Sequence, residues 1–340
     1  MQRPVPPRRS FTAGLLVALG LILTMGTAAA QTKTVRVAKQ FGISYLPLTL
    51  IEDKKLIEAH ARRLGLEVKT EWVQLTSGTP MNEALISGSV DFVSGGVGPL
   101  LSIWGKTREN FAVKAVAALN AMPLYLTSIN PSVKSIKDFT DRDRIALPAL
   151  RVSIQAITLQ MAAESAFGPG QQYRLDPLTV SLSHPDGLAQ LLSGRSEITA
   201  HFTSAPFMYQ ELADPRVRKI LDSYEVLGGP HTFNLVWTTG KFHAENPKLV
   251  EAFIAALDEA MQSIARDPAA AAAIWVRAEN SKLSADYIEK LIRLPENEWT
   301  MVPKKIMAYA EFMSRAGMLP VKPASWRDMF FSDAYRLPGS

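Results

Sequence analysis

The sequence has no cysteine among its 340 residues. This absence excludes disulfide bonds, cysteine nucleophiles, thiolate zinc sites and cofactors held through thioether bonds. Histidine is scarce, and its five copies are spread so widely that no two have the spacing of paired metal ligands. The loops considered below also lack G-x-S-x-G, H-E-x-x-H, a Walker-A lysine loop and a complete G-x-G-x-x-G. We therefore expect no metal, no cofactor and no catalysis.

A large charge of one sign is lacking too, and part of the net charge of +5 comes from the start of the chain. Residues 1–30 contain three arginines and no acid, then an apolar run centred on residues 15–23 and small residues up to Ala30. This order is typical of a secretory signal peptide cleaved near Ala30. A membrane anchor is the alternative, but the apolar run is shorter than the ~20 residues that span a bilayer. The pair Arg8 and Arg9 resembles a twin-arginine export signal, so that route and the general secretory route both stay open.

Without those three arginines the net charge falls to +2, and the rest of the chain has no clustered basic run. A nucleic-acid partner would need such a basic face, so we expect none. No cysteine follows the signal to accept a lipid, which predicts a soluble exported protein. An outer membrane retains such a protein, and we therefore expect a periplasmic location.

The length and the pattern of apolar residues predict two α/β lobes. A chain of 340 residues exceeds the ~250–300 residues that one core usually serves, and 47% of the residues are apolar. Short β-type runs alternate with helical stretches, which predicts parallel βαβ units. The predicted strands are residues 35–38, 68–73, 90–93, 145–147, 178–182 and 198–201, and the predicted helices are residues 47–64, 81–86, 155–166 and 187–192 and one from residue 99. We expect each lobe to hold a mainly parallel sheet flanked by helices.

Two stretches of the chain echo each other, residues 84–93 and residues 190–199. Each has a helix end, a Ser-Gly pair, an acid and a strand, and its glycine suits the left-handed position after a helix. Two similar lobes explain the echo, although an αβ junction of this kind also arises by chance. From residue 246 the chain is expected to be helical to about Ala316.

The chain is expected to cross between the lobes twice, in extended apolar stretches at residues 121–127 and 233–238 that form two hinge strands. We assign residues 33–122 and 237–340 to lobe I with the C-terminal helices, and residues 126–232 to lobe II. Ligands of open parallel sheets bind at the carboxyl ends of the strands. The loops there are rich in Ser, Thr, Gly, Gln and aromatic residues and poor in acids, which suits a ligand held by hydroxyls, backbone N–H groups and helix dipoles.

Several residues of these loops have both a binding and a structural interpretation. Arg151 either pairs with a carboxylate or sulfonate or is a solvated loop residue. His201 either contacts a ligand or is a buried core residue. His184 either contacts a ligand or is a turn residue. Phe41 and Tyr45 either form a wall of the pocket or pack between elements.

Three segments resemble a known family when they are taken together. They are A-L-I-S-G-S-V-D-F at residues 84–92, S-I-K-D-F at residues 135–139 before I-A-L-P, and A-E-N-P-K-L-V-E-A-F at residues 244–253. The sequence resembles periplasmic solute-binding proteins of ABC importers in the nitrate, sulfonate and taurine group, which includes binders of thiamine pyrimidine precursors. The resemblance covers residues 35–267.

This resemblance implies a two-lobed protein that closes about its hinge and delivers a small molecule to a membrane permease, and such binders are usually monomers. Carried over residue by residue, it places the pocket on Phe41, Gly42, Tyr45, Thr76, Ser77, Ser94 and Gly96 in lobe I, on Arg151, Ser153, Gln155, His201 and Thr203 in lobe II, and on Phe233 and Asn234 of the return crossing. The sequence departs from the family pattern at Arg151 and His201, which puts taurine and simple sulfonates in doubt as substrates.

We expect the ligand to be a small organic anion related to sulfonates or carboxylates. The alternative is an enzyme of the same fold that acts on a pyrimidine or a small organic acid. Enzymes of that kind depend on cysteine, which this chain lacks. A third interpretation is a sensor domain, which would normally be fused to a membrane span or a DNA-binding segment.

Overall fold

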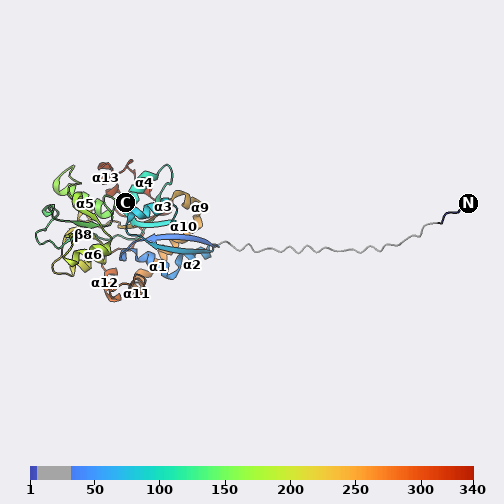
Figure 1. Ribbon diagram of the computed structural model, residues 1–340, viewed down its shortest axis with the longest axis horizontal. Helices are drawn as coiled ribbons and strands as arrows, with labels where there is room; N and C mark the ends of the chain where they lie inside the picture. The colour runs from blue at the N-terminus through green and yellow to red at the C-terminus, as the bar shows by residue number, and fades with distance from the viewer. Residues whose placement is uncertain (6–31) are drawn as a thin grey trace. The chain divides into compact units, whose positions relative to one another are not determined.

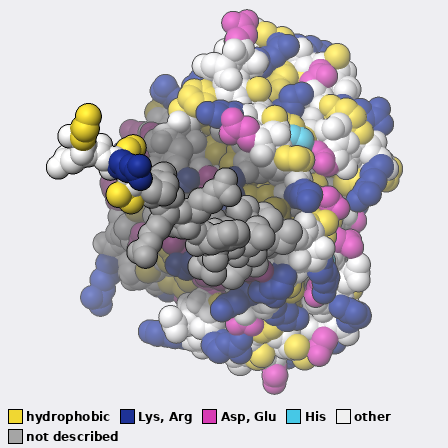
Figure 2. All heavy atoms as spheres, turned by 90° about the vertical axis from the view of Figure 1, so that its right-hand side faces the viewer, with side chains coloured by type: hydrophobic (Ala, Val, Ile, Leu, Met, Phe, Trp, Pro, Cys, Tyr) yellow, Lys and Arg dark blue, Asp and Glu magenta, His cyan; other side chains and the backbone are white. Residues whose placement is uncertain are grey.

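The computed structural model describes residues 1–5 and 32–340. The predicted signal peptide and its cleavage site lie for the most part outside the described residues. Within the described part of the chain, no helix is both long and apolar enough to cross a membrane. Figure 2 shows one face of the protein, on which lysine and arginine side chains are interspersed with aspartate and glutamate.

Within the described residues, ten strands form two five-stranded sheets with the same internal order. The first sheet has the order β2-β1-β3-β10-β4 and the second has the order β7-β6-β8-β5-β9. The strands are β1 (Lys33–Lys39), β2 (Val68–Gln74), β3 (Phe92–Gly96), β4 (Lys114–Ala118), β5 (Tyr125–Ser128), β6 (Ile145–Leu147), β7 (Thr179–Ser181), β8 (Ala200–Thr203), β9 (Arg218–Asp222) and β10 (Asn234–Thr238). Each predicted strand is present, with bounds that differ by a few residues.

Four strands of each sheet run in one direction and the fifth runs against them. In the first sheet β1 pairs in parallel with β2 and β3, and β10 is antiparallel to both β3 and β4. In the second sheet β6 pairs in parallel with β7 and β8, and β5 is antiparallel to both β8 and β9. The reversed strands β10 and β5 are those that the chain forms just after it crosses from one sheet to the other. The expected α/β fold with mainly parallel sheets and two crossing strands is confirmed.

Thirteen α-helices within the described residues surround these sheets. They are α1 (Leu46–Lys54), α2 (Leu56–Arg63), α3 (Gly78–Ile86), α4 (Val97–Thr107), α5 (Ile154–Phe167), α6 (His184–Ser193), α7 (Phe207–Leu212), α8 (Ser223–Leu227), α9 (Gly240–Glu245), α10 (Pro247–Arg266), α11 (Pro268–Ala278), α12 (Ala285–Ile292) and α13 (Ile306–Arg315). The single helix expected over residues 47–64 is wrong, because Lys55 has a left-handed backbone (φ 51°) that separates α1 from α2. Gly88 and Gly194 both have positive φ just after α3 and α6, as the sequence echo predicts.

The C-terminal part of the chain departs from the expectation of continuous helix to Ala316. Between α12 and α13 an irregular, non-helical segment passes beside both crossings. Glu298 and Ala121 exchange two backbone hydrogen bonds of 2.9 and 2.8 Å, and the N–H of Thr232 donates to the carbonyl of Lys304 at 3.0 Å. The hinge therefore consists of three segments, whereas the sequence predicted two.

Helix α13 packs against α4 on one side and α5 on the other (Figure 1). Its Arg315 forms an ion pair with Glu164 of α5 at 2.8 Å, and the Tyr309 hydroxyl lies 3.1 Å from Oγ1 of Thr158. The largest cluster of buried apolar residues includes α13 and side chains from both sheets. The two sheets are thus held together by an apolar core as well as by the hinge.

Candidate functional site

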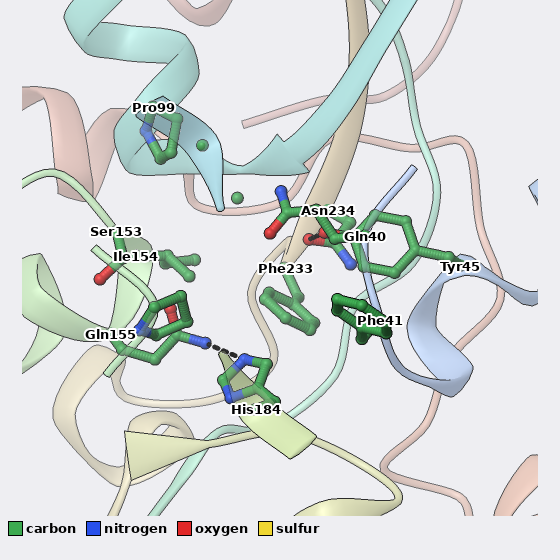
Figure 3. Close-up of a pocket in the computed structure, with 13 residues that line it drawn as sticks. Gln40, Phe41, Tyr45, Pro99, Ser153, Ile154, Gln155, His184, Phe233 and Asn234 are labelled. Carbon is green, nitrogen blue, oxygen red and sulfur yellow. Dashed lines mark hydrogen bonds between the residues drawn. The ribbon is translucent and has the colours of Figure 1, made fainter. Parts of the chain in front are cut away.

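A small cavity lies where the two sheets face each other (Figure 3). Its volume is about 20 Å³, which is room for about one water molecule, so the cavity is nearly closed in this structure. The lining consists of Gln40, Phe41, Tyr45, Gly78, Gly96, Pro99, Pro148, Ser153, Ile154, Gln155, His184, Phe233 and Asn234. No aspartate, glutamate, lysine or arginine is among these described lining residues.

Four helices begin at this cavity. The lining includes Gly78 at the first position of α3, Gly96 just before α4, Ile154 and Gln155 at the start of α5, and His184 at the first position of α6. The first turn of a helix leaves N–H groups without helical partners and carries a partial positive charge. The four helix starts therefore contribute partial positive charge at the cavity, although no lysine or arginine is among its described lining residues.

The two sheets approach closely at the starts of α4 and α5. A Cβ placed on Gly96 would lie 2.7 Å from Cγ2 of Ile154, and one placed on Gly98 would lie 2.4 Å from the carbonyl oxygen of Val152. Both distances are shorter than contacts with a real Cβ. The glycines allow this contact, which closes one side of the cavity.

On the side of the first sheet, polar groups fix the loop that follows β1. The Tyr45 hydroxyl donates to Oδ1 of Asn234 at 3.2 Å, and Nδ2 of Asn234 donates to Oγ of Ser44 at 2.8 Å. Burial raises the pKa of Tyr45, so its hydroxyl stays protonated and remains a donor. Gln40 donates from Nε2 to the carbonyl of Ser94 at 3.1 Å. In Figure 3, Phe41 and Phe233 lie next to these groups and form the apolar part of the wall.

On the side of the second sheet, Gln155 and His184 face each other across the end of the cavity (Figure 3). Nε2 of Gln155 lies 3.3 Å from Nε2 of His184. Burial is the main reason that the pKa of His184 is well below its ordinary value, and the neighbouring His201 lowers it further. His184 is therefore neutral at pH 7 in the absence of a ligand.

The structure brings half of the predicted site residues to the cavity. Phe41, Tyr45, Gly96, Ser153, Gln155, Phe233 and Asn234 all belong to its lining. Ser153 also accepts a hydrogen bond from the N–H of Ala156 at 3.2 Å and thereby caps α5.

The other half lies near the cavity but not in its lining. Thr76 is exposed, and Arg151 is an exposed residue with φ 62° whose charge acts on Asp176. Ser77 is the buried residue before α3, and Ser94 donates to the carbonyl of Ala38 at 2.8 Å.

Three further predicted residues belong to the layer around the cavity. Gly42 packs against the loop after β8, because a Cβ on it would lie 3.1 Å from the carbonyl of Ala205. His201 and Thr203 are fully buried on β8 behind His184.

The residues that sequence reasoning did not select are Gln40, Gly78, Pro99, Pro148, Ile154 and His184. All of them lie in or next to the loops that follow predicted strands, so their positions in the chain were a usable signal. His184 had been considered with a turn residue as its alternative. Among the residues that the structure describes, no group of three or more His, Asp or Glu side chains is placed to hold a metal ion.

No family model matches the sequence, and no curated protein matches it at a significant level. Solved structures do match. The alkanesulfonate-binding protein SsuA from Xanthomonas axonopodis pv. citri, bound to MOPS, has a TM-score of 0.67 and 19% identity over 88% of this chain and 99% of its own. The periplasmic nitrate-binding protein NrtA from Synechocystis PCC 6803 has a TM-score of 0.71 and 16% identity over 90% of this chain and 88% of its own.

The chain has the periplasmic binding protein fold. The periplasmic aliphatic sulphonate binding protein SsuA from Escherichia coli agrees, with a TM-score of 0.64 and 19% identity over 89% of this chain and 99% of its own. The resemblance found in the sequence is thus confirmed at the level of the fold. Sequence identities below one fifth show that the fold is shared, but they do not identify the ligand of this chain. The ligand must be inferred from the residues of the chain itself.

Proposed function

We propose that this protein is the substrate-binding component of an ABC importer. It captures a small organic anion of the sulfonate or carboxylate class between its two lobes and delivers that anion to a permease in the inner membrane. It acts as a periplasmic monomer without catalysis of its own. Lobe I comprises residues 33–122 and 237–340, and lobe II comprises residues 126–232.

One observation carries this proposal: four helices begin at a cavity between two sheets, and no acidic side chain is among the described residues that line it. Anions bind at helix N-termini because unpaired N–H groups and the helix dipole both favour negative charge. An acidic group in the lining would oppose an anion, and a metal centre or nucleophile would be needed for most catalysis. This arrangement therefore supports the binding of an anion rather than its chemical conversion.

The position of the cavity supports closure of the two lobes around the ligand. Its lining comes from both sheets, so a ligand that contacts both stabilises the closed form by its higher affinity for that form. The crossings at the hinge absorb the rotation of the lobes.

Thermal-shift and calorimetric titrations of the purified protein test the proposed function. The probes are methanesulfonate, ethanesulfonate, nitrate, acetate and benzoate, with uracil as a neutral comparison. A ligand present at 100 times its Kd stabilises the protein by about 2.7 kcal/mol and raises the Tm by several degrees. We expect at least one anion to do so and to be recovered unchanged. Failure of every anion, or chemical conversion of the one that binds, would overturn the proposal.

Export is tested separately, in a bacterium with an outer membrane. We expect the mature protein in the periplasmic fraction with an N-terminus near Gln31. Replacing Arg8 and Arg9 by lysine distinguishes the export routes, because the twin-arginine route requires the pair and the general route tolerates lysine. An uncleaved protein in the membrane fraction would contradict the signal-peptide interpretation.

A further inference from the structure

A line of hydrogen-bonded side chains leads from the cavity into the interior of the second sheet. Nδ1 of His184 lies 3.2 Å from Nε2 of His201, and Nδ1 of His201 lies 2.6 Å from Oε1 of Glu211. At the outer end, Nε2 of the Gln155 amide lies 3.3 Å from Nε2 of His184, and both of these residues line the cavity. We call Glu211, His201, His184 and Gln155 the network.

The inner pair of the network is an ion pair inside the protein. His201 and Glu211 have no exposed surface, and the only ion pair of Glu211 within the described residues is the one with His201. A buried carboxylate without a cation is costly, so we assign a compensating positive charge to its partner. Imidazole is a stronger base than a carboxylate, which places that charge on His201. Both ring nitrogens of His201 therefore carry a proton, and Nε2 is a donor.

His184 is the neutral member of the network. Burial is the main cause of its lowered pKa, and the positive charge of His201 lowers that pKa further. A neutral imidazole has one N–H donor and one bare nitrogen that accepts. Nδ1 of His184 faces the Nε2–H of His201 at 3.2 Å and the Thr203 hydroxyl at 2.9 Å, so Nδ1 is the acceptor. The one ring proton of His184 is therefore on Nε2, at the wall of the cavity.

The direction of these hydrogen bonds continues to the side-chain amide of Gln155. Two N–H groups do not bond to each other, so the amide turns its oxygen toward the Nε2–H of His184. Rotation by 180° exchanges the two ends of an amide and leaves this contact in place. Within the described part of the chain, His184 is the only hydrogen-bond partner of this side chain, and Gln155 is 2% exposed. Its NH₂ group is thus left for a ligand in the cavity.

We propose that Glu211 is a positioning residue that makes the Gln155 end of the cavity a hydrogen-bond donor. This inference rests on the proposed function. The carboxylate holds the charge on His201, His201 holds the proton of His184 on Nε2, and His184 leaves the NH₂ group of Gln155 for the ligand. The ligands that fit have oxygens that only accept hydrogen bonds, as sulfonates, carboxylates and nitrate do. A ligand with an N–H at this end would face another donor, so the network selects against it.

The charge of Glu211 is needed because a neutral His201 does not fix this direction. A neutral ring has one N–H, and a bare Nε2 on His201 would accept a hydrogen bond from Nδ1 of His184 instead. The Gln155 amide would then donate to Nε2 of His184 and present its oxygen to the cavity, where it repels the oxygens of an anion. An imidazolium has N–H groups on both nitrogens, so it permits only one direction.

The packing around the inner pair holds the network in a fixed geometry. Gly187 of α6 lies directly against the imidazole, and a Cβ there would be 2.6 Å from Nε2 of His201. Any side chain at this position would push His201 away from His184. On the far side, the second carboxylate oxygen of Glu211 accepts a hydrogen bond from Thr127 at 2.6 Å. The rings and the carboxylate therefore stay within hydrogen-bond distance of each other.

Imidazole nitrogen NMR of the unaltered, unliganded protein at pH 7 tests the direction of the hydrogen bonds. We expect the ring proton of His184 on Nε2, and protons on both ring nitrogens of His201. Spectra of His184→Gln and His201→Gln assign the two rings, because each variant lacks one set of signals. A His184 ring with its proton on Nδ1 would overturn the proposal.

Calorimetry with methanesulfonate and methanesulfonamide measures the selectivity. The two molecules have nearly the same size, but the sulfonamide replaces one acceptor oxygen by an NH₂ donor and has no charge. We expect methanesulfonate to bind the unaltered protein at least tenfold more tightly than methanesulfonamide. Nitrate is titrated beside them as a second ligand that only accepts hydrogen bonds.

Glu211→Gln keeps the shape of the side chain and removes the charge that holds His201 protonated. We expect the ring proton of His184 to divide between Nδ1 and Nε2, and the Kd for methanesulfonate or nitrate to rise about tenfold. The Kd for methanesulfonamide should change less than threefold. The matched control is Glu259→Gln, which removes the carboxylate partner of His60 (2.8 Å) on α10. This control should keep the His184 signal and every Kd of the unaltered protein.

The outcomes separate the two proposals. Anion binding by a protein whose His184 carries its proton on Nδ1 overturns the role of Glu211 and leaves the proposed function intact. Equal weakening of sulfonate and sulfonamide in Glu211→Gln, with the His184 proton still on Nε2, assigns a merely structural role to Glu211 and also overturns it. If none of the anions binds, the proposed function fails and this inference fails with it. The spectrum of the unaltered protein decides the first of these outcomes, so the test stands even if Glu211→Gln does not fold.

Discussion

Gly98 of α4 lies so close to Val152 that a Cβ on the glycine would be 2.4 Å from the Val152 carbonyl oxygen. Gly98 follows β3 of the first sheet and Val152 follows β6 of the second, so the two residues are far apart in the chain. This contact exists only while the two sheets are close together. It therefore gives a way to disturb closure without disturbing either sheet.

Gly98→Ala should hold the lobes apart. The added methyl group meets a backbone atom, which cannot move aside as the end of a side chain can. We expect the Kd for the anion that binds the unaltered protein to rise tenfold or more, which is roughly 1.4 kcal/mol, with a larger radius of gyration in solution scattering. Lys106→Ala, an exposed change on the same helix, is the control and should alter neither quantity. Unchanged affinity and unchanged scattering for Gly98→Ala would contradict the closure argument.

Tyr45→Phe should destabilise the protein without changing its shape. The change removes the hydroxyl that donates to Oδ1 of Asn234 at 3.2 Å and leaves that buried oxygen without a partner. The free energy of unfolding in urea should fall by about 1–3 kcal/mol. In Tyr173→Phe, the lost hydroxyl bonds to the carbonyl of Ala316 at an exposed position, and the loss should be below about 0.5 kcal/mol. Equal losses in the two variants would argue against the role of burial at Tyr45.

The sequence was enough to predict most of the strands, because most are short runs rich in β-type residues and bounded by turn residues, but it missed β4 and β9. It also selected Phe41, Ser153 and Gln155, which belong to the lining of the cavity, since loops at the carboxyl ends of parallel strands converge. It could not show how far the lobes close. Ile154 lies in the cavity wall because it packs against Gly96, and that contact depends on the rotation of one lobe against the other.

The histidines show the same limit. His184 and His201 are 17 residues apart, and no local pattern indicates that their rings meet. They do so because α6 packs on β8, and the side chain of His201 fits against the backbone of Gly187. Likewise, the break at Lys55 and the irregular segment before α13 have no signal in the sequence pattern.

Asp143→Asn should reduce stability in a way that depends on pH. Burial alone would raise the pKa of Asp143, but hydrogen bonds from Thr140, Asn130 and Thr199 outweigh it and lower the pKa below its ordinary value of 3.8. A lowered pKa stabilises the folded state above the unfolded pKa, and this contribution is lost as the pH falls through the folded pKa.

We expect Asp143→Asn to lower the free energy of unfolding by about 1–3 kcal/mol at pH 7, with a difference that shrinks below pH 4. Urea unfolding at pH 7, 5 and 3 measures this difference. Asp141→Asn, an exposed change in the same turn, should show little effect at any pH. A difference for Asp143→Asn that stays constant down to pH 3 would show that its charge is not the cause.

His231 should make the hinge sensitive to acid. Its imidazole is buried between Ser223 and Tyr309, with Nε2 at 2.8 Å from the Ser223 hydroxyl, and burial lowers its pKa from 6.5 to about 4. The unfolded chain therefore binds a proton first as the pH falls. The contribution of His231 to the free energy of unfolding is fully present above pH 6.5. It is lost as the pH falls from 6.5 to 4, by about 3 kcal/mol in total.

His231→Gln cannot take up that proton, so its unfolding free energy should be lower at pH 7 but should fall less steeply over the same interval. Parallel pH profiles for His231→Gln and the unaltered protein would assign the acid sensitivity to other groups, of which the buried His184 is the first to examine.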